Sequence, residues 1–86
     1  MVSPEEVEAV LEQHPAVREV VVLGAADEAR GEVVRAAIVP HDAPPAIGGL
    51  QRFCREYLAG YKVPRHWGFR ATLPRSSLGK VLRHSL

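Results

Sequence analysis

The sequence predicts a small α+β domain in which two to three helices cover a sheet of about three strands. Three observations lead to this fold class. Two stretches carry apolar residues at the spacing of a helix face, two others are short and rich in β-branched residues, and a fifth alternates apolar with other residues. The chain has 86 residues and room for one core, so residues 1–86 are expected to form a single domain.

The first helix is expected over residues 4–14. Ser3 suits the N-cap position, Pro4 suits the first helical position, and Glu6 lies three residues after Ser3, as in a capping box. The positions that follow are spaced to form one inward-facing stripe, which consists of Val7, Val10, Leu11 and His14. Pro15 cannot continue a helix and marks its end.

Two strands are expected after this helix. Residues 18–24 contain a run of valines that is typical of a buried strand, and residues 32–40 have a similar apolar content. The polar connection at residues 24–31 is short. The two strands are therefore expected to pair in an antiparallel fashion.

The next helix is expected over residues 49–59, after a loop at residues 41–49. This stretch has the clearest helical spacing in the chain, and Gly60 suits a left-handed stop after it. The apolar residues at this spacing are Leu50, Phe53, Cys54, Tyr57 and Leu58.

The remaining residues predict a third strand and a last helix. Trp67, Phe69 and Ala71 alternate with other residues, as in a half-buried strand. Residues 73–80 are then expected to form a loop, and residues 81–86 a short helix.

The composition excludes several classes of protein. A single cysteine cannot form an intramolecular disulfide and, with no signal-peptide pattern, it indicates a reducing cytoplasm. No apolar run approaches the roughly 20 residues of a membrane span. The histidines, at positions 14, 41, 66 and 84, lack the spacing of metal ligands, so no metal site is expected. Cys54 is expected to be a small buried hydrophobe rather than a reactive thiol.

The net charge of +1 conceals a polarity along the chain. Residues 1–43 carry three arginines and nine carboxylates, for a net charge of −6, whereas residues 44–86 carry eight basic residues and one carboxylate, for +7. This asymmetry suggests an anionic partner for the second half, although a dipolar solvated surface would look the same. Nucleic acid is not favoured as that partner, because no lysine cluster with interleaved aromatic residues is present.

The loop at residues 73–80 is the stretch that indicates chemistry. Gly79 lets the backbone come close to a ligand, and Lys80 places a point charge on a long side chain, which suits phosphate or carboxylate oxygens. A phosphate-binding P-loop is rejected, because Pro74 replaces its first glycine and Val81 lacks the hydroxyl that would bind magnesium.

Five motifs occur in one order along the chain: Ser3-Pro-Glu-Glu-Val-Glu, His14-Pro-Ala-Val, Asp27-Glu-x-Arg-Gly-Glu, Tyr61-Lys-Val-Pro-Arg and Leu73-Pro-Arg-x-x-x-Gly-Lys-Val-x-Arg. Together they resemble the C-terminal domain of the acyl-CoA synthetase, adenylation-domain and luciferase superfamily. The resemblance covers nearly the whole chain.

The resemblance implies a role for Lys80. In this family a large N-terminal domain binds ATP and a carboxylic acid, and the small domain closes over it as a lid. Lys80, after Pro74 and Gly79, would enter the active site during adenylation and be the catalytic residue, with Gly79 beside the nucleotide. Arg75 and Arg83 are candidate contacts to nucleotide phosphates or to the 3′-phosphate of CoA, with ordinary solvated arginines as the alternative.

The resemblance also implies partners. These are the large domain, ATP with magnesium bound mainly by that domain, and CoA, as in an acyl-CoA synthetase. Two alternatives stay open: a lid that serves a phosphopantetheine carrier protein, and a stand-alone domain that binds or complements without catalysis. The hinge and the nucleotide-binding domain of the family have no counterpart in these residues, so the chain alone is expected to be inactive. Leu78 departs from the serine or threonine of many relatives.

Overall fold

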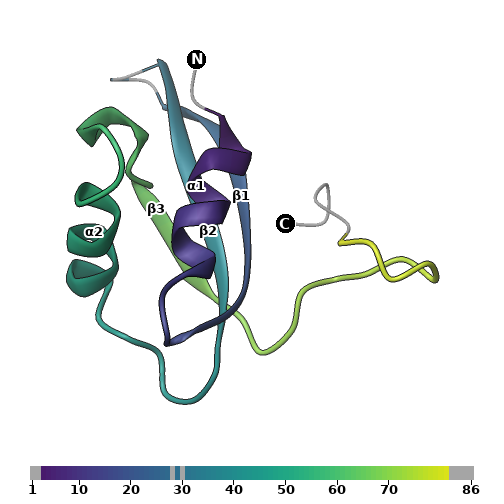
Figure 1. Ribbon diagram of the computed structural model, residues 1–86. Coiled ribbons are helices and arrows are strands. Elements are labelled where there is room, and N and C mark those ends of the chain that lie inside the picture. The colour runs from purple at the N-terminus through teal and green to yellow at the C-terminus, as the bar shows by residue number, and fades with distance from the viewer. Residues whose placement is uncertain (1–2, 28, 30, 82–86) are drawn as a thin grey trace.

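The computed structural model describes residues 3–27, 29 and 31–81, and its elements confirm the α+β class (Figure 1). In chain order they are α1 (Pro4–Glu12), β1 (Val17–Asp27), β2 (Gly31–Pro40), α2 (Ile47–Arg55), the 3₁₀ helix η1 (Gly60–Lys62) and β3 (His66–Phe69). The strands form one sheet in the order β1-β2-β3. The pairing of β1 with β2 is antiparallel, as predicted, and that of β2 with β3 is parallel.

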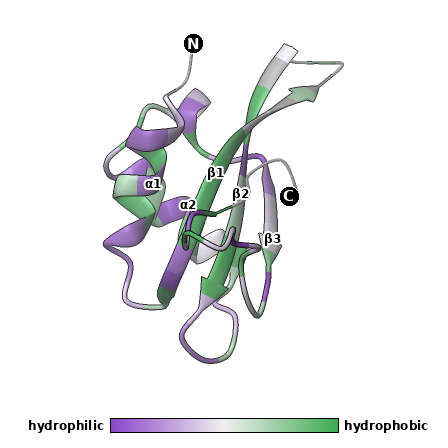
Figure 2. Cartoon of the chain, turned by 90° about the vertical axis from the view of Figure 1, so that its right-hand side faces the viewer, coloured by the Kyte–Doolittle hydropathy of each residue, from purple (hydrophilic) through white to green (hydrophobic). Residues whose placement is uncertain are grey.

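The two helices cover one face of the sheet, where the main core lies (Figure 2). Leu11 of α1 and Leu50 of α2 are fully buried there, together with Val22 of β1 and Ile38 of β2. The stripe predicted for the first helix is confirmed at Val7, which is also fully buried. Burial of such aliphatic side chains is the main stabilising contribution in a domain of this size.

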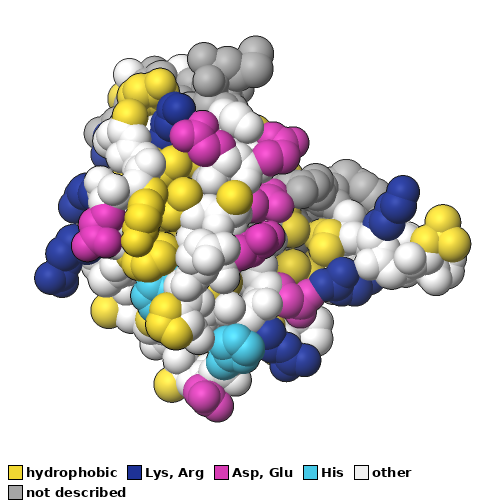
Figure 3. All heavy atoms as spheres, viewed as in Figure 1, with side chains coloured by type: hydrophobic (Ala, Val, Ile, Leu, Met, Phe, Trp, Pro, Cys, Tyr) yellow, Lys and Arg dark blue, Asp and Glu magenta, His cyan; other side chains and the backbone are white. Residues whose placement is uncertain are grey.

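A second, smaller core lies on the other face of the sheet. Val21, Ala37 and Val39 are buried there by Leu73, which belongs to the segment after β3. This segment then stands away from the sheet and forms a projection on one side of the domain (Figure 3). Because β1 and β2 are buried on both faces, their sequences are nearly continuous apolar runs rather than alternating ones.

Strand β3 is shorter than predicted. Trp67 and Phe69 are half-buried and pack against the main core, as expected, and the Trp67 Nε1 donates to the Pro64 carbonyl oxygen at 2.9 Å. The strand ends at Phe69, however, and Ala71 is exposed in a bend outside it. The last backbone bond to β2 is from the Arg70 amide to the Ile38 carbonyl, after which the chain crosses to the other face.

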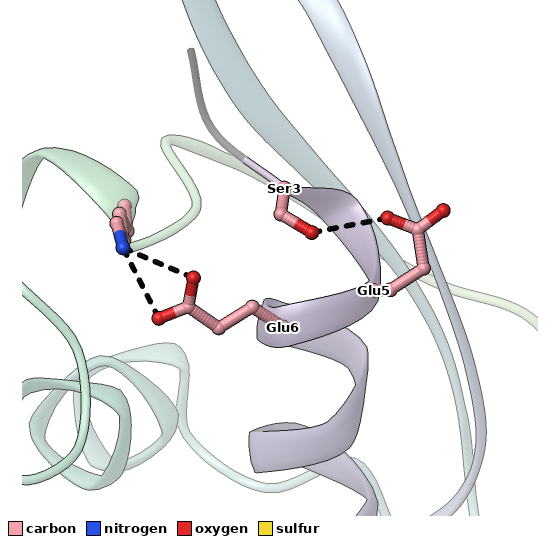
Figure 4. Close-up of polar contacts among 4 residues, drawn as sticks. Ser3, Glu5 and Glu6 are labelled. Atoms are coloured by element: carbon pink, nitrogen blue, oxygen red, sulfur yellow. Dashed lines mark hydrogen bonds and ion pairs between the residues drawn. The ribbon is translucent and has the colours of Figure 1, made fainter.

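The start of α1 differs from the predicted capping box. Ser3 is the N-cap residue but makes no side-chain bond to the helix backbone, and its hydroxyl donates instead to Glu5 at 3.1 Å (Figure 4). Glu6 accepts two bonds from the Lys62 Nζ, at 3.1 and 3.0 Å, which join α1 to η1. This charge-assisted contact takes the carboxylate away from the helix start. The helix ends at Glu12, with Gln13 as its C-cap.

Helix α2 begins two residues earlier than predicted, at Ile47, and ends at Arg55. Its expected face is confirmed at Leu50 and Cys54. Beyond the end of the helix, Leu58 is buried as expected, whereas Tyr57 is 63% exposed. The left-handed stop at Gly60 is wrong. Among the described residues positive φ occurs only at Gly31 and Gly79, and Gly60 begins η1 instead.

The helix predicted at residues 81–86 lies almost entirely outside the described residues. Val81 itself pairs with Arg75 in an isolated antiparallel bridge. Across the ranges that the structure describes, no helix is long and apolar enough to cross a membrane.

Candidate functional site

Gly79 and Lys80, two of the residues predicted to carry chemistry, lie in a tight turn on the projecting segment. The antiparallel bridge between Arg75 and Val81 closes the base of this turn, and the Ser76 amide donates to the Lys80 carbonyl oxygen at 2.8 Å. Inside it, the Gly79 amide donates to the Ser76 carbonyl oxygen at 2.9 Å. Residues 76–80 are called the Lys80 turn below. The predicted loop is therefore an ordered turn fixed by its own hydrogen bonds.

Gly79 gives the Lys80 turn its shape. Its φ is +83°, a left-handed conformation that glycine adopts at little cost and that other residues rarely adopt. A Cβ atom built at Gly79 would meet no atom within 4 Å, so the requirement for glycine is conformational rather than steric.

Lys80 and Leu78 are the two large exposed side chains of the turn. Lys80 follows the left-handed glycine and is exposed, and Leu78 is 83% exposed. Figure 3 shows the projection carrying both basic and apolar side chains, clear of the sheet. An extended lysine here can enter a cleft of another surface without disturbing the core of this domain.

Arg75 lies at the base of the turn and has two partners within the domain. Its Nη1 donates to the Gly79 carbonyl oxygen at 3.0 Å, and its Nη2 forms an ion pair with Glu19 of β1. Its suggested contact with a nucleotide phosphate stays a prediction. Arg83, the other candidate, lies outside the described residues.

Sequence reasoning missed Glu19 as a partner of this site. Glu19 is 56 residues from Arg75 in sequence, and no local spacing relates the two. The one available signal was a carboxylate near the start of a mainly apolar strand, which usually requires a partner when it is half-buried.

A basic groove is a second feature that the sequence did not reveal. It lies over β2 and β3, has a volume of about 290 Å³, and includes Arg35, His66 and Arg70 in its lining. Arg35 lies in β2, His66 lies opposite it in β3, and Arg70 directly follows β3, so only the parallel pairing brings them together. Arg70 belongs to the basic second half of the chain, whereas Arg35 belongs to the acidic first half.

The described metal-ligand types and the single cysteine give no sign of a further site. In the part of the chain that the structure describes, no three side chains among histidine, cysteine, aspartate and glutamate are grouped to hold a metal ion. Burial raises the pKa of the Cys54 thiol to about 11, which keeps it protonated at neutral pH. A buried, protonated thiol is a poor nucleophile.

Fold and turn together define a small α+β domain that presents one lysine on an ordered, projecting turn. The family model of the AMP-binding enzyme C-terminal domain matches residues 6–80. The chain therefore belongs to this family, as the sequence motifs predicted.

Similar proteins extend this assignment. The chain is 44% identical over 85 residues to the long-chain-fatty-acid–CoA ligase of Escherichia coli O6:H1, a match that covers 99% of this chain and 15% of that protein. A double mutant of o-succinylbenzoate CoA synthetase from Bacillus subtilis, solved with its product analogue, has a TM-score of 0.90 at 44% identity, covering 99% of this chain. The same synthetase with its acyl-adenylate intermediate has a TM-score of 0.88 at 43% identity over 96% of this chain. The chain spans 17% of each solved chain.

Proposed function

We propose that residues 1–86 form the mobile C-terminal lid of an ATP-dependent acid–thiol ligase of the acyl-CoA synthetase type. In this proposal the domain closes over the active site of a larger N-terminal domain, and Lys80 is the adenylation lysine. The observation that carries the proposal is the Lys80 turn, which holds an exposed lysine on a hydrogen-bonded projection outside the core.

The chemistry assigned to Lys80 is electrostatic. In adenylation a carboxylate oxygen attacks the α-phosphorus of ATP, the bond to the β-phosphate breaks, and pyrophosphate leaves. Negative charge builds on the oxygens around phosphorus, and an ammonium group beside them lowers the barrier by offsetting it. The lysine needs no proton transfer for this role. ATP and magnesium are assigned to the larger domain.

The second half-reaction gives the domain its proposed acceptor. A thiolate attacks the acyl carbon of the adenylate, a carbon–sulfur bond forms, and AMP leaves. CoA is proposed as the thiol because the matched E. coli protein is a CoA ligase and a matched B. subtilis synthetase was solved with its product analogue. A carrier protein and a stand-alone binding domain are the competing outcomes of the test.

The test uses a chimera in which these residues replace the matching C-terminal part of the E. coli fatty-acid ligase. Lys80→Ala should lower adenylation, measured as pyrophosphate release, by roughly 10²-fold or more. Thioester formation from a supplied acyl-adenylate should change little. Lys80→Arg should restore only part of the adenylation rate, because a planar guanidinium cannot replace a point charge.

Lys62→Ala is the matched control, since Lys62 is bound to Glu6 on another side of the domain. Equal losses in both half-reactions of Lys80→Ala would assign Lys80 to folding or docking instead. Near-normal adenylation would make it an ordinary surface lysine. A preference for a phosphopantetheine carrier over CoA as acceptor would favour the carrier-protein alternative.

A further inference from the structure

Arg75 connects the Lys80 turn to the sheet. Its guanidinium lies between two oxygen partners, the Glu19 carboxylate on β1 and the Gly79 carbonyl at the residue just before Lys80. The guanidinium is planar with donors in a fixed fork, so two partners on different atoms define its orientation. The Arg75 side chain therefore holds the turn to β1, whereas the backbone bonds of the turn close it internally.

A β-bulge places Glu19 where it can make this contact. The register of β1 against β2 shifts between Val17 and Glu19. Val17 belongs to the main core under the helices, whereas Val21, two residues after Glu19, belongs to the core on the other face. In a regular strand without a bulge, Val17 and Glu19 are two residues apart and would point to the same face. The bulge turns the carboxylate toward the segment that carries the Lys80 turn.

The solvent exposure of the Arg75–Glu19 pair indicates how much it contributes to stability. The side chains of Arg75 and Glu19 are 44% and 29% exposed, and ion pairs exposed to this degree add little to the free energy of unfolding. The main effect of Arg75 is on the geometry of the turn, because its second contact fixes the carbonyl oxygen of Gly79, the residue with positive φ in the turn. Small displacements of a reacting group are costly for catalysis even where they cost little stability.

We infer that Arg75 and Glu19 are positioning residues that hold the Lys80 turn in the shape required for adenylation, and that Arg75 does not act by contacting nucleotide phosphate. This inference rests on the proposed function of Lys80. It differs from the sequence-based suggestion because it assigns both guanidinium contacts to this domain.

The test measures adenylation in the chimera with Arg75→Met, Glu19→Gln and the double variant. Each single change should lower kcat roughly 10-fold with the KM for ATP unchanged, because the lysine is displaced while nucleotide binding is not. The double variant should be no worse than the more severe single one, since both changes break one connection. Arg52→Met and Glu12→Gln, exposed residues on the two helices, are the matched controls and should leave the rate unchanged.

A charge exchange distinguishes positioning from simple ion pairing. Glu19→Arg combined with Arg75→Glu restores an ion pair but not a donor to the Gly79 carbonyl, so the adenylation rate should stay low. Full recovery by this exchange would overturn the inference. It would also be overturned if Arg75→Met raised the KM for ATP while Glu19→Gln left it unchanged, which is the result expected of a phosphate contact.

Failure of the inference can be told apart from failure of the proposed function. If Lys80→Ala lowers adenylation and the Arg75 and Glu19 variants do not, only the positioning role is wrong. If Lys80→Ala has no effect, the adenylation role itself falls. Far-ultraviolet circular dichroism of each chimera confirms that a loss of rate is not a loss of fold.

Discussion

At the scale of single residues, Gly79 and Lys80 make different contributions to the Lys80 turn. Gly79 supplies a backbone conformation with φ of +83°, and Lys80 supplies a charge in an exposed position. The two requirements are independent, because one concerns the backbone and the other the side chain. Sequence alone indicated both residues, since glycine followed by lysine in a loop suits close approach to an anion.

Replacing Gly79 by alanine should test the conformational requirement. Gly79→Ala should lower the free energy of unfolding by about 1 kcal/mol, because a Cβ atom disfavours positive φ. Gly48→Ala is the control: Gly48 lies in α2 and also has open space around a built Cβ, so this change should stabilise by about 0.5 kcal/mol. Urea denaturation measures both. Equal effects would mean that the turn relaxes to another conformation.

At the scale of elements, α1, α2 and the three strands were predicted correctly in kind and order, with errors at their ends, and η1 was not predicted. Apolar periodicity continues past the end of α2 to Leu58, so spacing alone placed Tyr57 inside the helix and Gly60 at its stop. In the same way, alternation extended the third strand to Ala71, although the chain leaves the sheet after Phe69. The spacing of apolar residues indicates which side chains can face a core, but it does not indicate where the backbone hydrogen bonds of a helix or strand end.

The segment after β3 behaves as an element although it has little regular structure. Leu73 is 5% exposed against the sheet, and Leu78 is 83% exposed in the Lys80 turn. Leu73→Ala should therefore lower the free energy of unfolding by about 2–3 kcal/mol, through lost burial and a cavity. Leu78→Ala should stay within about 0.5 kcal/mol of the parent chain. Thermal and urea denaturation compare the two, and a similar loss at both positions would show that Leu78 packs against the domain in solution.

At the scale of the whole molecule, the main core and the smaller core lie on opposite faces of one sheet. The radius of gyration is 12.5 Å, against about 12 Å for a compact chain of this length. No polar side chain is fully buried among the described residues, so no buried charge needs a partner domain to neutralise it. The domain is therefore expected to be stable by itself, while its proposed chemistry requires a second domain.

The 86-residue chain alone should show this separation between folding and activity. We expect a cooperative melt by far-ultraviolet circular dichroism, because helices and sheet share the main core. We expect no ATP-dependent thioester formation, because the proposed sites for ATP and the acid lie in the larger domain. Appreciable turnover by the chain alone would contradict the lid function, and a non-cooperative melt would contradict the independent fold.

The sequence by itself determined the fold class, the order of α1, α2 and the three strands, and the loop that contains Gly79 and Lys80. Each of these depends on local spacing or on residue types that are adjacent in the chain, and the family motifs carry the same local information.

Only the tertiary structure decided the contacts between distant parts of the chain. Examples are the parallel pairing of β3 with β2, the pair of Glu6 with Lys62, and the pair of Glu19 with Arg75. The last depends on a bulge that turns one carboxylate to the far face of the sheet. The physical reason is that local patterns record whether a side chain is buried, whereas its partner is fixed only when separate elements pack against one another.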